Sequence, residues 1–306
     1  DFLLKTSLKW VTIEYNLKVG DYMSKYHKGP NLYVNHLVLK IIDIDRAIKF
    51  YTKIMGFSLL KKEDNMAVFS ADGFNPIVTI IEPEDVVPKP ARRTGLYHFA
   101  VLLPTRYDLG LFIKNIRDEW YPIIGGAYHG VSEAIYLEDP DGNGIEVYCD
   151  TEESKWDRRG SSINMVTEPL DYGDLIDLTG DDKWDKAPLK TKIGHIHLHV
   201  ADLDEARKFY CDGLGFDLIM EAGNSAIFLS TGGYHHHIGL NSWQGKGAAP
   251  LPDNSVGMLY YDLVFPDEGK REEKLNKLMK LGYEVMKEEK DIFVKDPSSN
   301  LIRFVI

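Results

Sequence analysis

The chain has 306 residues, 44% of them hydrophobic and 27% charged, which predicts a globular protein of about two domains with a sizeable core. Its net charge of −11 argues against nucleic acid or an anionic membrane as the main partner, because both require clustered lysine and arginine. No apolar run approaches the roughly 18 residues of a membrane span. No signal peptide precedes the first strand, and Cys149 and Cys211 are the only cysteines. We therefore expect a cytoplasmic protein whose partners are small molecules.

The first regular pattern begins at Asn31, after residues 1–30, which we interpret as an N-terminal extension of unknown role. Residues 32–42 predict a strand, and the acidic residues that follow are typical N-caps for a helix over 46–55. Short strands near residues 58–60, 66–70 and 77–81 come next. The segment therefore predicts a β-α-β-β-β unit.

The same unit returns 159 residues later along the chain. At this offset His36 corresponds to His195, and Asp43 corresponds to Asp202. A match that keeps one constant offset over many residues indicates an internal repeat.

Two further units, residues 95–148 and 257–305, complete the repeat. The chain is therefore predicted to have an α+β fold of four tandem βαβββ modules. We expect two domains of two modules each, residues 31–150 and 191–306, joined by a linker over residues 151–190.

Glu146 lies within the short apolar strand that follows the turn at residues 139–144. An unpaired buried charge costs several kcal/mol or more, so this carboxylate requires solvent, a cation or a metal. The last module keeps the turn but has Arg303 in place of Glu146 and Tyr260 in place of His98. Because the two changes occur together, they indicate a metal site that one module holds and another has lost.

His98 and Glu146 supply two members of a 2-His-1-carboxylate set, the ligand set of non-haem Fe(II) oxygenases. The third member is either His36 or His195, which occupy the same position in the repeat. His36 is favoured if the neighbouring modules 1 and 2 close around one site. A denser cluster in module 3 favours His195, which we expect to be the ligand. The cluster consists of His195, His197, His199, His235, His236 and His237.

Several motifs resemble the vicinal oxygen chelate superfamily, and within it the two-domain, four-module extradiol ring-cleaving proteins of the catechol 2,3-dioxygenase type. The resemblance covers residues 31–306. It is carried by residues 95–100, 194–198 and 232–238, and by the run from His129 through Tyr136 to Glu146. That run is similar to the extradiol dioxygenase signature and departs from it only at Ala127.

The resemblance implies two glyoxalase-like open barrels and an Fe(II) ion, with Mn(II) as the alternative metal. Glu146 and His98 would be metal ligands, and His129 and Tyr136 would face the substrate. In some relatives the modules pair one with four and two with three, which would bring His195 to this site. One histidine of the run 235–237 would act as an acid or base, and His236 is the candidate.

The implied substrates are a small aromatic vicinal diol and O2, and the ring would open beside the diol. The oligomeric state is left open, with a homo-oligomer among the expected forms. A glyoxalase- or epimerase-like enzyme that binds Zn, Ni or Mn through four protein ligands is a second interpretation. A Glu or Gln on the last strand of the partner module would favour it. A third is a metal-free module that sequesters an aromatic compound.

Overall fold

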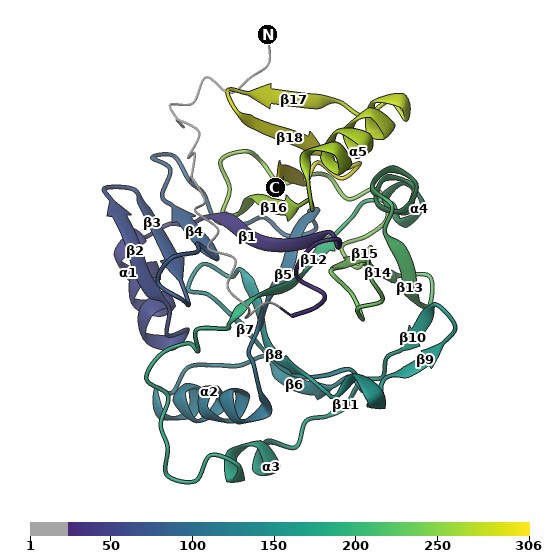
Figure 1. Ribbon diagram of the computed structural model, residues 1–306. Coiled ribbons are helices and arrows are strands. Elements are labelled where there is room, and N and C mark those ends of the chain that lie inside the picture. Colours follow the sequence, from purple (N-terminus) through teal and green to yellow (C-terminus); the bar gives the residue numbers. More distant parts are fainter. Residues whose placement is uncertain (1–23) are drawn as a thin grey trace.

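The computed structural model describes residues 24–306, so the first 23 residues of the expected N-terminal extension lie outside the described part of the chain. The described strands form a sheet of eight strands, a sheet of nine strands and a separate two-stranded hairpin (Figure 1). Both large sheets curl, and helices pack against them (Figure 1). The predicted α+β fold with two open barrels is confirmed.

Four modules and a connecting segment follow one another along the chain. Module 1 consists of β1 (Tyr33–Lys40), α1 (Ile44–Lys49) with its continuation η1 (Phe50–Ile54), β2 (Ser58–Glu63), β3 (Met66–Ser70) and β4 (Val78–Ile81). Module 2 consists of β5 (Gly95–Leu102), α2 (Arg106–Asp118), β6 (Gly125–Tyr128), β7 (Ser132–Glu138) and β8 (Gly144–Asp150). The connecting segment holds η2 (Glu153–Lys155), β9 (Asp157–Arg159), β10 (Ser162–Asn164), β11 (Glu168–Pro169) and α3 (Tyr172–Asp177). Module 3 consists of β12 (Lys192–His199), α4 (Leu203–Arg207), η3 (Lys208–Leu214), β13 (Asp217–Ala222), β14 (Ala226–Ser230) and β15 (Ile238–Asn241). Module 4 consists of β16 (Gly257–Val264), α5 (Glu268–Lys280), β17 (Val285–Glu288), β18 (Asp291–Lys295) and β19 (Leu301–Val305).

A side-chain cap starts the helix of every module. Asp43, Thr105, Asp202 and Asp267 each accept a hydrogen bond from a backbone N–H in the first helical turn, at 2.9 Å from Arg46 in module 1. Such caps satisfy donors that have no partner within the helix. Because the cap recurs at the same place, it provides a common reference for comparing positions in the four modules.

The modules do not pair in the order of the sequence. The nine-stranded sheet has the order β11-β6-β7-β8-β5-β12-β15-β14-β13 and joins modules 2 and 3. The eight-stranded sheet has the order β17-β18-β19-β16-β1-β4-β3-β2 and joins modules 1 and 4. Each sheet therefore takes one module from residues 31–150 and one from residues 191–306.

The connecting segment, residues 151–190, is folded onto module 2. β11 pairs with the edge strand β6, and α3 packs against α2. The helices approach closely at Gly110, where an added Cβ would lie 2.1 Å from the carbonyl oxygen of Leu175. Part of the region expected as a linker thus extends one of the two sheets.

Alternate side chains of β12 face the hydrophobic core and the cavities on the opposite side of the strand. Ile196 and Leu198 belong to the large hydrophobic core that spans both sheets. His195, His197 and His199 alternate with them, and because neighbouring strand residues point to opposite faces, the three imidazoles share the other face. The strand is thus apolar where it packs and ionisable where it faces a cavity.

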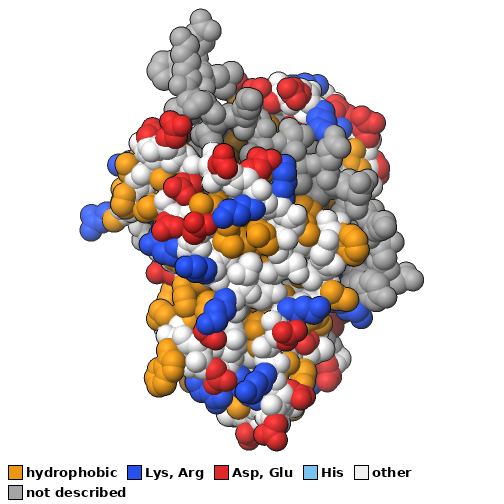
Figure 2. Space-filling model, turned by 90° about the vertical axis from the view of Figure 1, so that its left-hand side faces the viewer, with side chains coloured by type: hydrophobic (Ala, Val, Ile, Leu, Met, Phe, Trp, Pro, Cys, Tyr) orange, Lys and Arg blue, Asp and Glu red, His pale blue; other side chains and the backbone are white. Residues whose placement is uncertain are grey.

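The surface carries charges of both signs. Figure 2 shows lysine and arginine side chains interspersed with aspartate and glutamate on the face that it presents, between small patches of hydrophobic side chains. Among residues 24–306, no helix has the length and apolarity needed to cross a membrane.

Candidate metal centre

Three predicted residues from three strands meet at one buried point of the nine-stranded sheet. Glu146 Oε2 lies 3.0 Å from His98 Nε2 and 3.2 Å from His195 Nε2. Their exposed fractions are 4%, 6% and 1%. Within the described residues, 24–306, this is the only group of three or more ionisable side chains arranged to hold a metal ion.

The sheet register brings these side chains together. β5 lies between β8 and β12, so that Ala100 is opposite Glu146 on one side and opposite His195 on the other. His98 lies two residues before Ala100 and therefore on the same face. The methyl group of Ala100 leaves room between the carboxylate and the imidazoles.

The electrostatics of the group suit a cation. Burial would raise the pKa of Glu146, but the imidazoles of His195 and His98 hold it well below its ordinary value. Burial lowers the pKa of His195 to about 4. The carboxylate is therefore ionised and His195 is neutral near pH 7, which are the protonation states that metal ligands need.

The spacing also fits an octahedral ion. Ligands in adjacent octahedral positions lie ~3.0 Å apart when each bond is about 2.1 Å long. The separations of 3.0 and 3.2 Å around Glu146 Oε2 match that value. His98 Nε2 is buried and lies 3.0 Å from Glu146 Oε2, but the angles do not make this contact a hydrogen bond, which suits a nitrogen placed to bind a metal.

His129 and Tyr136 lie together beside the three side chains. His129 Nε2 is 2.7 Å from the Tyr136 hydroxyl, and His129 Nδ1 is 2.8 Å from the carbonyl oxygen of Val166. Tyr136 pairs with Glu146 across β7 and β8. Both residues line a cavity of about 340 Å³ that also reaches His98 and Glu146. Burial, followed by the charge of Glu146, raises the pKa of Tyr136 well above its ordinary value.

The histidine run 235–237 lies directly before β15, which begins at Ile238. Of the three, His236 lines the cavity, and its ring centroid is 4.0 Å from that of His195. His237 turns away and its Nε2 donates to the carbonyl oxygen of Tyr26 at 3.0 Å.

His235 connects His236 to a carboxylate that sequence reasoning missed. His235 Nδ1 lies 2.8 Å from His236 Nδ1, and His235 Nε2 lies 2.9 Å from Asp150 Oδ1. Asp150 follows Glu146 and Tyr148 at every second position of β8. This alternation was the available signal, because it places the carboxylate on the face of Glu146.

His36, the other candidate for the third ligand, lies in the eight-stranded sheet. Its Nδ1 is 3.1 Å from Asp262 Oδ2 and its Nε2 is 2.9 Å from Thr79 Oγ1. Arg303 makes two hydrogen bonds to Asp262, of 2.8 and 2.7 Å. A buried ion pair thus occupies the place in this sheet that the three side chains occupy in the other.

The position that could supply a fourth protein ligand holds a glycine. In module 2, Glu146 lies opposite Ala100, which is five residues before the helix cap Thr105. In module 3, the residue five before the helix cap Asp202 is His197, and it lies opposite Gly239. A Cβ at Gly239 would lie 2.9 Å from the ring of His197. Neither the Glu nor the Gln that would favour a glyoxalase-like site is present there.

The fold and the site together define a class of protein: four βαβββ modules that form two barrels, one of which carries a buried group of two histidines and one carboxylate. Residues 33–147 and 192–304 match the Glyoxalase/Bleomycin resistance protein/Dioxygenase superfamily, and the chain belongs to this family. A catechol-2,3-dioxygenase from Bacillus subtilis strain 168 is 43% identical over 289 residues, which cover 93% of this chain and 100% of that protein. The resemblance seen in the sequence motifs is confirmed.

Solved structures show the same fold at low sequence identity. A protein from Bacillus subtilis strain 168 with a provisional assignment as a dioxygenase superposes with a TM-score of 0.63 at 14% identity, covering 89% of this chain and 84% of that one. Glyoxalase I from Zea mays superposes with a TM-score of 0.55 at 18% identity, covering 90% and 92%. At these identities the likeness concerns the architecture alone.

Proposed function

We propose that the chain is an Fe(II)-dependent extradiol dioxygenase that inserts O2 into the ring of a catechol-type vicinal diol. The observation that carries the proposal is the convergence of His98, Glu146 and His195 on one buried point beside a cavity. Full-length homology to a catechol-2,3-dioxygenase supports it.

The ligand set leaves room for the two substrates. Two imidazoles and one carboxylate occupy one face of an octahedral ion, so three positions remain for a chelating diol and for O2. Bound Fe(II) would supply Lewis acidity toward the diol oxygens and a route for electrons from the ring to O2. Mn(II) accepts the same donors and is the alternative ion.

Tyr136 and His129 are arranged to hold a diol hydroxyl. The carbonyl oxygen of Val166 can only accept, so His129 Nδ1 carries the hydrogen and neutral Nε2 accepts from the Tyr136 hydroxyl. The Tyr136 oxygen then has lone pairs free for a donor in the cavity. We therefore assign Tyr136 to accept a hydrogen bond from the substrate, with His129 fixing its orientation.

His236 is placed to act as an acid or base. With Asp150 ionised, His235 donates from Nε2 to the carboxylate, so its Nδ1 accepts a hydrogen bond from His236 Nδ1–H. The other ring nitrogen of His236 is then unprotonated. Such a nitrogen can take a proton from a diol hydroxyl and return it when the ring opens.

The test is anaerobic purification, reconstitution with Fe(II), and addition of catechol and air. We expect about one iron per chain, one O2 consumed per catechol and a yellow ring-opened product, and a parallel reconstitution with Mn(II) compares the two ions. Zinc or nickel without colour would instead favour the glyoxalase or epimerase interpretation. A chain that retains no metal would contradict the roles of His98, Glu146 and His195.

Two properties stay predictions. A cytoplasmic location rests on the low cysteine content. A homo-oligomer would be tested by light scattering of the metal-loaded protein.

A further inference from the structure

A second, outer cavity adjoins the cavity of the metal centre. It has a volume of about 570 Å³ and shares Tyr97, His98, Ala127 and Tyr136 with the inner cavity. It is also lined by Ile124, whose side chain is 69% exposed, so it is open to solvent. A substrate whose diol lies at the metal centre would direct its far end into this space.

The outer cavity is lined by cations although the chain is acidic overall. Lys89, Arg92 and Arg93, from the connection between β4 and β5, line it, and among the lining residues of the range 24–306 Glu138 is the only one with a carboxylate. Lys89 Nζ donates to the carbonyl oxygen of Leu96 at 2.9 Å. Neither Arg92 nor Arg93 forms a side-chain hydrogen bond or an ion pair with any residue of the described range 24–306. Two guanidinium groups are therefore available to an anion.

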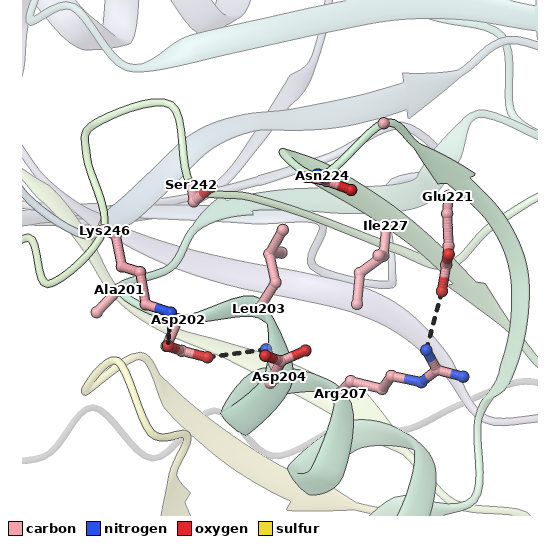
Figure 3. Close-up of a pocket in the computed structure, with 11 residues that line it drawn as sticks. Ala201, Asp202, Leu203, Asp204, Arg207, Glu221, Asn224, Ile227, Ser242 and Lys246 are labelled. Atoms are coloured by element: carbon pink, nitrogen blue, oxygen red, sulfur yellow. Dashed lines mark hydrogen bonds and ion pairs between the residues drawn. The ribbon is translucent and has the colours of Figure 1, made fainter.

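The cavity drawn in Figure 3 provides a contrast. It has a volume of about 360 Å³ and lies at the start of α4. Its two cations are already paired, Lys246 with Asp202 at 3.1 Å and Arg207 with Glu221 at 2.9 Å. Charges that neutralise one another in this way are ordinary surface pairs. By contrast, Arg92 and Arg93 of the outer cavity form no ion pair with any residue of the range 24–306.

The backbone holds the two arginines at the edge of the outer cavity. Val87 forms a bridge with Ser255, and Arg93 forms one with Ala249, so the segment is attached to the other half of the chain at both ends. Arg92 has a φ of 57°, a left-handed conformation that is unfavourable for a non-glycine residue. Tertiary contacts therefore impose a conformation that the segment would not adopt alone.

We propose that the outer cavity is a carboxylate-binding subsite and that the preferred substrates are catechols with an acidic side chain. The inference rests on the proposed function for the diol end of the ligand, and on Arg92 and Arg93 for the acidic end. A guanidinium presents parallel N–H donors that match the two oxygens of a carboxylate. The aromatic ring would lie between the two cavities, beside the shared residues Tyr97 and Tyr136.

The test uses monophenols, because they cannot be cleaved and so report binding independently of turnover. The binding of 4-hydroxyphenylacetate and of its neutral isostere 4-hydroxyphenylacetamide to the Fe(II)-loaded protein would be measured by anaerobic calorimetry at low ionic strength. A hydrogen-bonded charge pair predicts that the acid binds about 10-fold more tightly than the amide. The R92Q/R93Q double variant should reduce this preference to less than about 3-fold, since both guanidinium groups are lost.

The controls are K246Q and R207Q in the cavity of Figure 3, which should leave the preference unchanged. Equal affinities for acid and amide, no measurable binding of the acid, or a preference that survives in R92Q/R93Q would each overturn the inference. Catechol turnover is measured separately. Ring opening without a preference for the acid would contradict only the subsite, whereas the preference without ring opening would contradict only the proposed dioxygenase activity.

Discussion

The chemistry of each barrel depends on a few residues at matching positions. Seven residues before the four caps, Asp43, Thr105, Asp202 and Asp267, the chain has His36, His98, His195 and Tyr260. The residue five before each cap lies opposite one residue of the last strand of the same module. In modules 1 to 4 these last-strand residues are Thr79, Glu146, Gly239 and Arg303. Of the two pairings in the structure, that of modules 2 and 3 combines two histidines with a carboxylate, and that of modules 1 and 4 does not.

The two candidate histidines can be distinguished by metal content. We expect His195→Gln to lower iron affinity at least 100-fold, because even residues that only support a ligand contribute about 10–100-fold. His36→Gln, its matched control in the other sheet, should retain about one iron per chain while lowering thermal stability. Metal analysis after gel filtration decides, and loss of iron in His36→Gln with retention in His195→Gln would reverse the assignment.

Asp150 is expected to act on the reaction through His235 and His236. Asp150→Asn removes the charge that fixes the His235 tautomer, so kcat should fall about 10-fold, a part of the 100- to 10,000-fold that acid–base catalysis typically contributes. KM and iron content should stay unchanged. Steady-state kinetics of Asp150→Asn, His236→Phe and the double variant provide the check. If the double variant loses the product of the two single effects, the residues act independently and the connection is wrong.

At the scale of elements, the antiparallel pair of β5 and β12 assembles the candidate metal centre. This pair sets His195 beside Ala100, while the parallel pair of β5 and β8 sets Glu146 on the other side. The corresponding pair of β1 and β16 sets His36 opposite Asp262. The same geometry therefore builds a metal centre in one sheet and an ion pair in the other.

Removing one partner of the buried ion pair between Asp262 and Arg303 in the eight-stranded sheet should lower the free energy of unfolding. Arg303→Leu removes the guanidinium that makes two hydrogen bonds to the buried Asp262 carboxylate, while His36 stays 3.1 Å away, and such a loss typically costs about 3–5 kcal/mol. Asp262→Leu/Arg303→Leu removes the buried charge of Asp262 as well, and Asp291, 3.7 Å from Arg303, is partly exposed, so we expect most of that stability to return. Chemical denaturation of the two variants gives the comparison. A double variant no more stable than Arg303→Leu would show that the pair does more than neutralise charge.

At the scale of the whole molecule, the metal centre is built across the connecting segment. His98 and Glu146 precede residues 151–190 and His195 follows them. The large core spans both sheets, with β1 and β12 in contact at the centre. The two halves of the chain are thus interleaved.

We therefore expect residues 1–160 alone to bind no iron and to show no dioxygenase activity. This fragment lacks His195 and leaves the β5 edge with unpaired backbone groups, which favours aggregation. Residues 161–306 alone should be inactive as well, and coexpression of the two fragments should restore activity. Full activity of residues 1–160 would show that the composite site is wrong.

Local sequence patterns determined much of this protein. The caps, the turns and the alternation of apolar residues depend on neighbours along the chain, and so they predicted four βαβββ modules. The repeat also isolated His98 and Glu146, because the exchange of both for Tyr260 and Arg303 is visible without a structure.

Only the tertiary structure decided which modules pair. All four modules begin with a similar strand, so no local pattern states which first strands will be neighbours; that depends on the summed packing of residues far apart in sequence. The pairing of β5 with β12 placed His195, and not His36, beside His98 and Glu146. It also placed Asp150 and His235 in contact and left Gly239 where a fourth ligand would lie, because such contacts exist only after distant strands have come together.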